Sequence, residues 1–324
     1  MDPRYIPRVI YAGIDEAGYG PLLGPLCVGA SAFRLADVRD ASTAPDLWSL
    51  LSLGVCRKPK DARRRIAIAD SKKLKSAGDQ PLIHLERGVM AFAGIDIACD
   101  AQLFARLGVH TRATMATPWH AREMTLPTSH TRDSLGIARN VVARALARAN
   151  AEVAHFGVCA LDAPSFNALY RSLANKAHVN MSLVFEAARN IDLLRGDEPA
   201  FLAIDRLGGR STYTRELEEH VARGARVRTI IESDERSAYE VGDGLFVSFE
   251  VQAEDRHLPV ALASMAAKYV RELVMRRLNA YFAERMPGLE PTAGYVEDGR
   301  RFLAEVKPIL LREAIPEGEF ARMV

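Results

Sequence analysis

The chain has 324 residues, of which 48% are hydrophobic and 26% are charged. These proportions are typical of a folded globular protein and exclude an intrinsically disordered chain. Lysine and arginine number 43 and aspartate and glutamate 41, so the net charge is only +2. Any nucleic-acid binding therefore has to come from a local basic surface rather than from the charge of the whole molecule.

The cysteines and the first residues bear on the cellular compartment. The four cysteines lie far apart and form no CxxC pair, which argues against a zinc knuckle and against a disulfide-stapled secreted domain. The N-terminal sequence lacks the apolar core of a signal peptide, and charged residues interrupt every longer apolar stretch. We therefore expect a cytoplasmic protein that does not associate with a membrane.

The first predicted elements form a hairpin. Residues 9–14 are a short, apolar and β-branched run, which predicts a buried strand. This run leads into Asp15, Glu16 and the glycine-rich sequence GYGPLLGP, and a second apolar run over 26–33 predicts the next strand. Two strands joined by a short glycine-rich turn indicate an antiparallel hairpin at the start of a mixed sheet.

Helices and strands alternate along the rest of the chain. Apolar residues at helical spacing predict helices over 81–92, 137–149, 179–194 and 259–285. Short apolar runs predict strands over 156–161, 201–204, 227–231 and 246–251. The alternation predicts an α/β fold with a central mixed β-sheet. Residues 108–133, which are rich in Thr, His, Met and Pro, have no clean period and are expected to form an inserted loop or lid.

Acidic residues follow several of the predicted strands. Asp15 and Glu16 end one strand, Asp205 ends another, and Glu254 and Asp255 lie just before the long helix. Ligands of α/β proteins usually bind where the strands end, and carboxylates that converge there repel each other unless cations bind them. Oxygen ligands suit Mg²⁺ or Mn²⁺, and two such ions can support phosphodiester hydrolysis. Since a strand-end aspartate is also a common turn former, the spacing alone leaves both interpretations open.

Four segments, in this order, resemble the signature segments of the type 2 ribonucleases H. They are 13–25 (GIDEAGYGPLLGP), 69–74 (ADSKKL), 203–205 (AID) with 215–219 (RELEE), and 252–268 (QAEDRHLPVALASMAAK). One DEAG match would be weak, whereas four matches in the family's order are specific. They lie within residues 9–285 and are interrupted by about 95–152, a stretch that the family lacks.

The resemblance implies a ribonuclease H-like fold, with a central mixed β-sheet flanked by helices, and a metal-dependent endoribonuclease. Such an enzyme uses Mg²⁺ or Mn²⁺ to hydrolyse the RNA strand of RNA·DNA hybrids, or ribonucleotides embedded in DNA, and leaves 3′-hydroxyl and 5′-phosphate ends. By the same resemblance, Asp15, Glu16, Asp205 and Glu254 are candidate metal ligands and catalytic residues. Asp255 is a further candidate catalytic residue, since the sequence leaves open whether Glu254 or Asp255 is the fourth carboxylate.

The resemblance also implies contacts with the nucleic acid. Glycines without a Cβ let the backbone approach the sugar and its 2′-hydroxyl, and lysines can contact flanking phosphates. The candidate binding residues are Gly18, Tyr19, Gly20, Ser71, Lys72, Lys73 and Tyr295. The run Arg63–Arg65 either follows a nucleic-acid backbone or forms a solvated basic turn.

Two departures from the family pattern leave the function open. Tyr19 stands where the family has arginine or lysine, and Glu254 stands where it has aspartate, with Asp255 next to it. Alternatives are therefore a nuclease of the same fold with another nucleic-acid substrate, and a non-catalytic protein that binds hybrids. We expect one domain over 1–324, in which about 95–152 form an insertion that is a lid or a partner surface. About 286–324 are expected to form a C-terminal extension on or near the substrate groove.

Overall fold

The computed structural model describes residues 8–36, 38, 41–74, 80–109 and 117–323. The strands are β1 (Arg8–Ala17), β2 (Leu26–Ala36), β3 (Val55–Cys56), β4 (Ile66–Ala67), β5 (Ala151–Leu161), β6 (Ala200–Asp205), β7 (Val227–Glu232), β8 (Arg236–Val241) and β9 (Leu245–Glu250). The longer helices are α2 (Ile83–Ala93), α4 (Arg132–Arg148), α5 (Ala163–Leu173), α6 (Lys176–Arg195), α9 (Leu258–Arg285) and α10 (Val296–Arg312). Shorter helices are α1 (Leu47–Leu50), η1 (Pro59–Asp61), α3 (Asp100–Arg106), η3 (Pro118–His120), α7 (Thr214–His220), α8 (Ala253–Arg256) and α11 (Glu317–Phe320).

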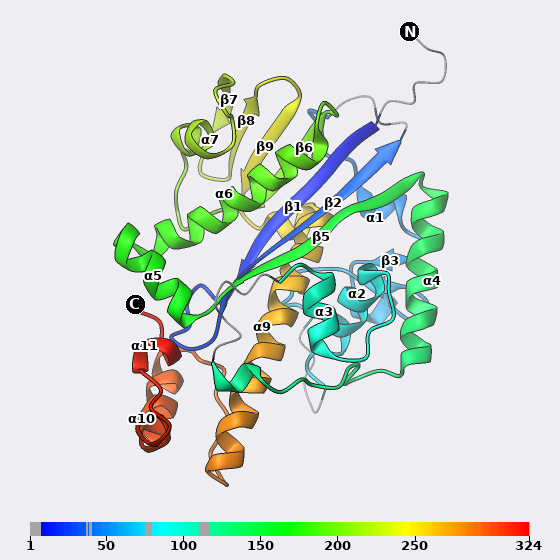
Figure 1. Cartoon of the computed structure of the whole chain (residues 1–324). Coiled ribbons are helices and arrows are strands. Elements are labelled where there is room, and N and C mark those ends of the chain that lie inside the picture. Colours follow the sequence, from blue (N-terminus) through cyan, green and yellow to red (C-terminus); the bar gives the residue numbers. More distant parts are fainter. Residues whose placement is uncertain (1–7, 37, 39–40, 75–79, 110–116, 324) are drawn as a thin grey trace.

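Seven strands form one mixed sheet in the order β5-β2-β1-β6-β9-β8-β7 (Figure 1). Strand β1 pairs antiparallel with β2, as the predicted hairpin requires, and parallel with β6. Strands β6 and β9 are also parallel, whereas β5, β8 and β7 join their neighbours antiparallel. The predicted fold class, an α/β fold with a central mixed sheet flanked by helices, is confirmed.

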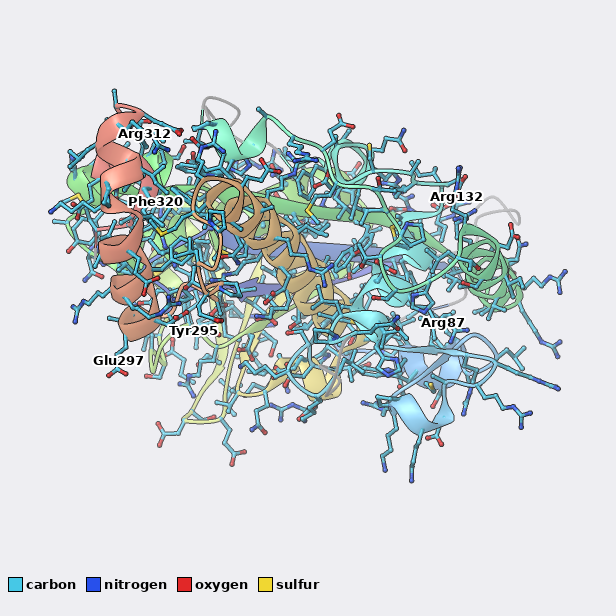
Figure 2. The ribbon with its side chains drawn as sticks, turned by 90° about the horizontal axis from the view of Figure 1, so that it is seen from below. Arg87, Arg132, Tyr295, Glu297, Arg312 and Phe320 are labelled. Atoms are coloured by element: carbon cyan, nitrogen blue, oxygen red, sulfur yellow. The ribbon has the colours of Figure 1, made fainter. Side chains whose placement is uncertain are left out.

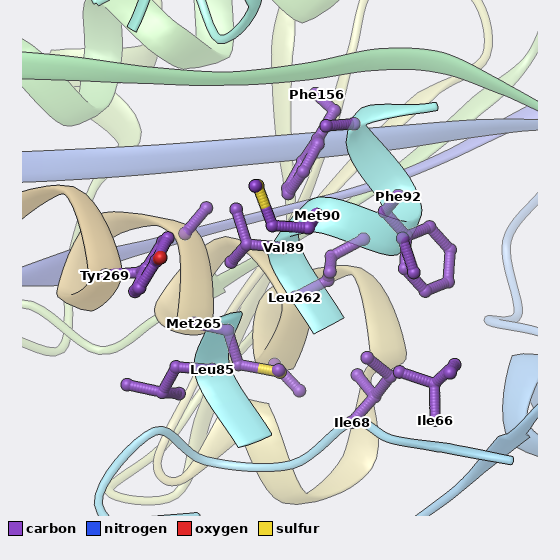
Figure 3. Close-up of a cluster of buried hydrophobic side chains, with 14 of the residues drawn as sticks. Ile66, Ile68, Leu85, Val89, Met90, Phe92, Phe156, Leu262, Met265 and Tyr269 are labelled. Carbon is purple, nitrogen blue, oxygen red and sulfur yellow. The ribbon is translucent and has the colours of Figure 1, made fainter. Parts of the chain in front are cut away.

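Helix α9 lies against one face of the sheet at unusually close range. A Cβ built on Gly13 of β1 would come within 2.2 Å of the Val260 nitrogen, and one on Gly29 of β2 within 2.2 Å of the Ala263 oxygen. Glycine at these two strand positions therefore allows the helix backbone to approach the sheet. Helices α2 and α4 also contribute to the hydrophobic core on this face of the sheet. Figure 3 shows part of this core, in which Val89 and Met90 of α2 cluster with Leu262 and Met265 of α9.

The opposite face of the sheet is covered by α5, α6 and α7, which form a second hydrophobic core (Figure 1). Helix α5 and strand β8 were not predicted. Asp162 caps α5 by accepting a hydrogen bond from the Ser165 backbone, and Pro164 lies in its first turn. Strand β8 has the sequence RSAYEV. Its charged residues interrupt the apolar run by which a strand is predicted, although the centre of the strand is buried.

The stretch expected as an insertion, about 95–152, contributes helices α3 and α4 to the first core through Leu103, Phe104, Leu135 and Val142. Of its expected loop or lid, residues 110–116 lie outside the described residues. The last segment, about 286–324, forms α10 and α11 beside the C-terminal half of α9 (Figure 1). None of the helices in the described part of the chain has both the length and the apolar character needed to cross a membrane.

Candidate active site

The sheet brings two of the predicted carboxylates together where two neighbouring strands end. Strands β1 and β6 are parallel and pair Ile14 with Ile204, so Asp15 and Asp205 follow at the same end of adjacent strands. After β9 the backbone turns at Gln252, which has a positive φ of 55°, into the short helix α8. The Ala253 nitrogen donates to Asp205 Oδ1 at 3.1 Å, which holds α8 against the end of β6.

Four carboxyl groups converge at these strand ends, and the pKa of each is raised. Burial raises the pKa of Asp15 well above its ordinary value, and the charges of Glu16 and Asp205 raise it further. Burial and the charge of Asp205 raise the pKa values of both Glu16 and Glu254 to about 7. Burial also raises the pKa of Asp205. The Glu254 Oε2 atom is buried and has no hydrogen-bond partner among the described residues.

An open pocket of about 660 Å³ lies beside this cluster. Its lining includes Asp205 and Glu254, together with Lys72 and Lys73 from the second signature segment. It also includes Asp70, a fifth carboxylate, which accepts a hydrogen bond from the Lys72 backbone at 3.0 Å and adds to the raised pKa of Glu254. Asp70 lies within the second signature segment, but no role was predicted for it.

The neighbours Glu254 and Asp255 face different surroundings. Glu254 lies with the carboxylate cluster, where the charge of Asp205 acts on it. The Asp255 carboxylate instead pairs with Lys73 at 2.6 Å, and its backbone oxygen accepts from Arg57 at 2.7 Å. Asp255 therefore lies at the rim of the pocket, engaged with two cations.

Serine side chains connect the second and fourth segments behind the cluster. The hydroxyl oxygen of Ser264 in α9 lies 3.1 Å from that of Ser71, within hydrogen-bond distance, and both residues are buried. A hydrogen bond from Ser264 also opposes the rise in the pKa of Asp15. Ser264 thus supports Asp15 from the helix, a role that the sequence analysis did not assign.

The glycine-rich turn after β1 has one crowded and one open glycine. Gly18 has a φ of +85°, and a Cβ there would lie 2.6 Å from the Arg271 side chain, whereas nothing lies within 4 Å of a Cβ built on Gly20. Tyr19 lies between these two glycines, and the Lys176 ammonium is 4.9 Å from the centre of the Tyr19 ring. Lys176 was not predicted as a neighbour of Tyr19, because it starts α6 and lies far from Tyr19 in the chain.

The C-terminal segment holds the far side of this turn. The backbone nitrogens of Leu22 and Leu23 donate to the Gly294 oxygen at 2.8 and 3.1 Å. Arg322 donates through its backbone to the Leu22 oxygen at 3.0 Å and through its guanidinium to the Pro21 oxygen. Tyr295, which follows Gly294, is 56% exposed and so is free to contact a ligand.

The donor chemistry of the cluster suits a divalent cation, because carboxylate oxygens are the ligands that Mg²⁺ and Mn²⁺ prefer. The buried, unpartnered Glu254 oxygen and the raised pKa values mark negative charge that the protein itself does not neutralise. Across the described residues, however, no group of three or more His, Cys, Asp or Glu side chains is already arranged as a metal site. The fold and site thus define an α/β protein with a carboxylate-lined pocket at its strand ends.

No protein-family model and no curated protein sequence matches this chain. The solved structures to which it is similar include RNase HII of Archaeoglobus fulgidus in a complex with PCNA, a Bst-RNase HIII in complex with Mn²⁺, and ribonuclease H2 of Pyrococcus horikoshii. Their sequence identities are 18, 17 and 13%, and their TM-scores are 0.42, 0.45 and 0.44. The matches cover 97, 98 and 96% of this chain and 94, 67 and 92% of those chains.

Proposed function

We propose that the protein is a metal-dependent endoribonuclease of the ribonuclease H type 2 family. The observation that carries this proposal is the convergence of Asp15, Glu16, Asp205 and Glu254 at one edge of the sheet, with a buried carboxylate oxygen unpartnered. These four residues would hold Mg²⁺ or Mn²⁺, with Asp70 nearby. Divalent ions in such a site supply the charge that stabilises the attacking and leaving oxygens in phosphodiester hydrolysis.

The residues around the carboxylate cluster indicate which substrate the proposed site would bind. Lys72 and Lys73 line the pocket and offer cations to phosphates that flank the cut. The space around Gly20 lets a sugar approach the backbone, where polar groups can read the 2′-hydroxyl that distinguishes RNA from DNA. We therefore propose RNA·DNA hybrids, or ribonucleotides embedded in DNA, as the substrate, with 3′-hydroxyl and 5′-phosphate ends as products.

Cleavage of a duplex that contains one ribonucleotide, with Mg²⁺ or Mn²⁺, tests the proposal. We expect Asp15→Asn to lower the cleavage rate at least about a hundredfold, because it removes a charge on which the cations depend. Asp133→Asn, the same change at an exposed position in α4, is the control and should cleave like the wild type. Equal rates for wild type and Asp15→Asn would contradict the proposal.

The same assay separates the alternatives. An RNA·DNA hybrid, an all-DNA duplex and a branched DNA are tested beside the single-ribonucleotide duplex. Cleavage of branched DNA alone would indicate a nuclease with another substrate. Tight binding of hybrid without turnover, whichever divalent ion is present, would indicate a non-catalytic hybrid-binding protein.

A further inference from the structure

One short segment, which we call the basic lobe (residues 57–73), carries a large local excess of positive charge. It contains eight lysines and arginines against two aspartates, whereas the whole chain has an excess of only two positive charges. The rest of the molecule is therefore net negative. A polyanion that meets this protein finds its main attraction at the basic lobe.

The basic lobe is a firmly held structure. Strands β3 and β4 pair in parallel on either side of the turn that contains η1, and Ala62, Ile66 and Ile68 are buried. The Trp48 indole nitrogen donates to the Ile68 oxygen at 2.9 Å, and Arg87 donates to the Ala62 oxygen at 3.1 Å. Because the apolar residues of the lobe are anchored inward, its charged residues project into solvent.

The exposed cations of the lobe are not neutralised by the protein. Lys58, Lys60, Arg63 and Arg64 are exposed. Within the described ranges, the ion pairs of the lobe involve only its two ends, Arg57 with Asp46 and Lys73 with Asp255. Figure 2 shows nitrogen-tipped side chains that project from this part of the blue ribbon, beside the labelled Arg87.

The lobe is continuous with the wall of the carboxylate pocket. Its C-terminal end supplies Lys72 and Lys73 to the pocket lining. Its N-terminal end returns to the same place, where the Arg57 guanidinium donates to the Asp255 oxygen at 2.7 Å. A surface of positive charge therefore starts at the pocket and extends away from it along the turn between β3 and β4.

We infer that the basic lobe binds the phosphate backbone of the duplex on one side of the cleavage position. The inference rests on the proposed function and adds that the substrate is a duplex with an arm long enough to reach Lys58, Lys60, Arg63 and Arg64. A duplex carries one negative charge per about 1.7 Å of its axis, so its backbone offers closely spaced phosphates to the unpaired cations of the lobe. Contacts of this kind position the duplex without reading its base sequence. The arm can be DNA or hybrid, because phosphates are common to both.

The test is the binding of fluorescent duplexes of about 8 and about 30 base pairs, all-DNA and RNA·DNA, measured by anisotropy across a salt series without divalent ions. We expect Arg63→Gln/Arg64→Gln to weaken binding of the longer duplexes about tenfold and to lower the salt slope by about 2. The loss should be equal for DNA and hybrid and smaller for the short duplexes. Lys58→Glu/Lys60→Glu, a second variant at exposed positions, should give the same pattern.

The control is Arg189→Gln/Arg226→Gln, which removes the same charge from exposed positions in α6 and next to β7, on the side of the sheet opposite the lobe. It should bind like the wild type. If the lobe variants fold and bind long duplexes with unchanged affinity and salt slope, the inference is wrong, whether or not the wild type cleaves. If wild-type binding depends on the lobe but no substrate is cleaved, the proposed function fails and the lobe inference stands.

Discussion

At the scale of single residues, Glu254 gives the clearest physical reason for the proposed cation site. Its Oε2 atom is buried without a hydrogen-bond partner, and its pKa is raised to about 7 by burial and by the charge of Asp205. Asp255, one residue further, has Lys73 as its partner. A partly buried carboxylate without a neutralising partner costs stability, and a bound cation would remove that cost.

Glu254→Gln should therefore stabilise the metal-free protein. The amide carries no charge, so the free energy of unfolding at pH 8 should rise on the order of 1 kcal/mol. On the proposed function, Mn²⁺ should raise the melting temperature of the wild type, and this rise should be smaller in the variant because one ligand is lost. Thermal melts with Mn²⁺ and with chelator measure both effects.

The matched control for this prediction is Asp255→Asn at the adjacent position. That substitution removes a charge from an ion pair rather than from the carboxylate cluster, so it should not stabilise the metal-free protein. If Glu254→Gln melts at a lower temperature than the wild type in chelator, repulsion within the cluster does not determine the stability of the metal-free protein.

At the scale of elements, Glu86 of α2 organises a segment that has no secondary structure of its own. It is fully buried and accepts hydrogen bonds of 2.8 Å from the Thr128 nitrogen, the Ser129 nitrogen and the Tyr269 hydroxyl. The His130 Nδ1 atom lies 3.2 Å from Glu86 Oε1, the oxygen that also accepts from the Ser129 nitrogen. Although burial opposes the charge, hydrogen bonds from His130, Thr128 and Ser129 lower the pKa of Glu86 to about 2.

This lowered pKa predicts the acid sensitivity of the fold. The folded pKa lies below the unfolded value, so the stabilisation is present at neutral pH and is lost as the pH falls from about 4.5 towards 2. The loss attributable to Glu86 is on the order of 3 kcal/mol. Glu86→Gln should destabilise the protein at pH 7 and flatten the acid branch of its stability curve.

Urea unfolding as a function of pH measures this effect. Glu305→Gln, the same change at an exposed residue of α10, should leave the acid branch as in the wild type. If Glu86→Gln and Glu305→Gln give the same curve, the hydrogen bonds to Glu86 do not control acid stability.

Elements whose apolar period is local could be predicted from the sequence, and elements held by distant partners could not. The β1–β2 hairpin and α9 follow from runs within a few residues, and α9 begins one residue before its predicted start. Residues 108–133 show no period because their described part is held from elsewhere in the chain. Thr128 is bound by Glu86, and the His120 oxygen accepts from Arg277 at 2.8 Å.

The same distinction applies to the candidate site. The strand-end carboxylates were visible in the sequence, because a strand end is a local signal. The sequence alone does not distinguish the roles of Glu254 and Asp255, since their different surroundings depend on the left-handed turn at Gln252 and on Lys73. Lys176 had no signal, because its place over Tyr19 follows from the packing of α6.

At the scale of the whole molecule, the C-terminal segment ties the candidate site to a third hydrophobic core. Phe320 is buried, and its ring centre lies 5.7 Å from that of Trp119 and 5.2 Å from that of Phe282. The residues that follow it, Ala321 and Arg322, pair with the turn that carries Gly18 and Gly20. Packing of this core should therefore determine how rigidly the turn is held.

Phe320→Ala tests this link. Removing a buried aromatic side chain should lower the free energy of unfolding by about 3 kcal/mol. Since Ala321 and Arg322 lose their anchor, the Leu22 and Leu23 amides should exchange hydrogen for deuterium faster, whereas amides in β5 should respond only to global unfolding.

Leu311→Ala is the matched control, because Leu311 lies in the same segment but is 74% exposed. It should change neither the free energy of unfolding nor the exchange of the turn. If Phe320→Ala destabilises the protein but the Leu22 and Leu23 amides keep their wild-type protection relative to β5, other contacts hold the turn, such as the hydrogen bonds with Gly294 and the one from Arg271 to the Leu23 oxygen. The C-terminal segment would then stabilise the molecule without acting on the site.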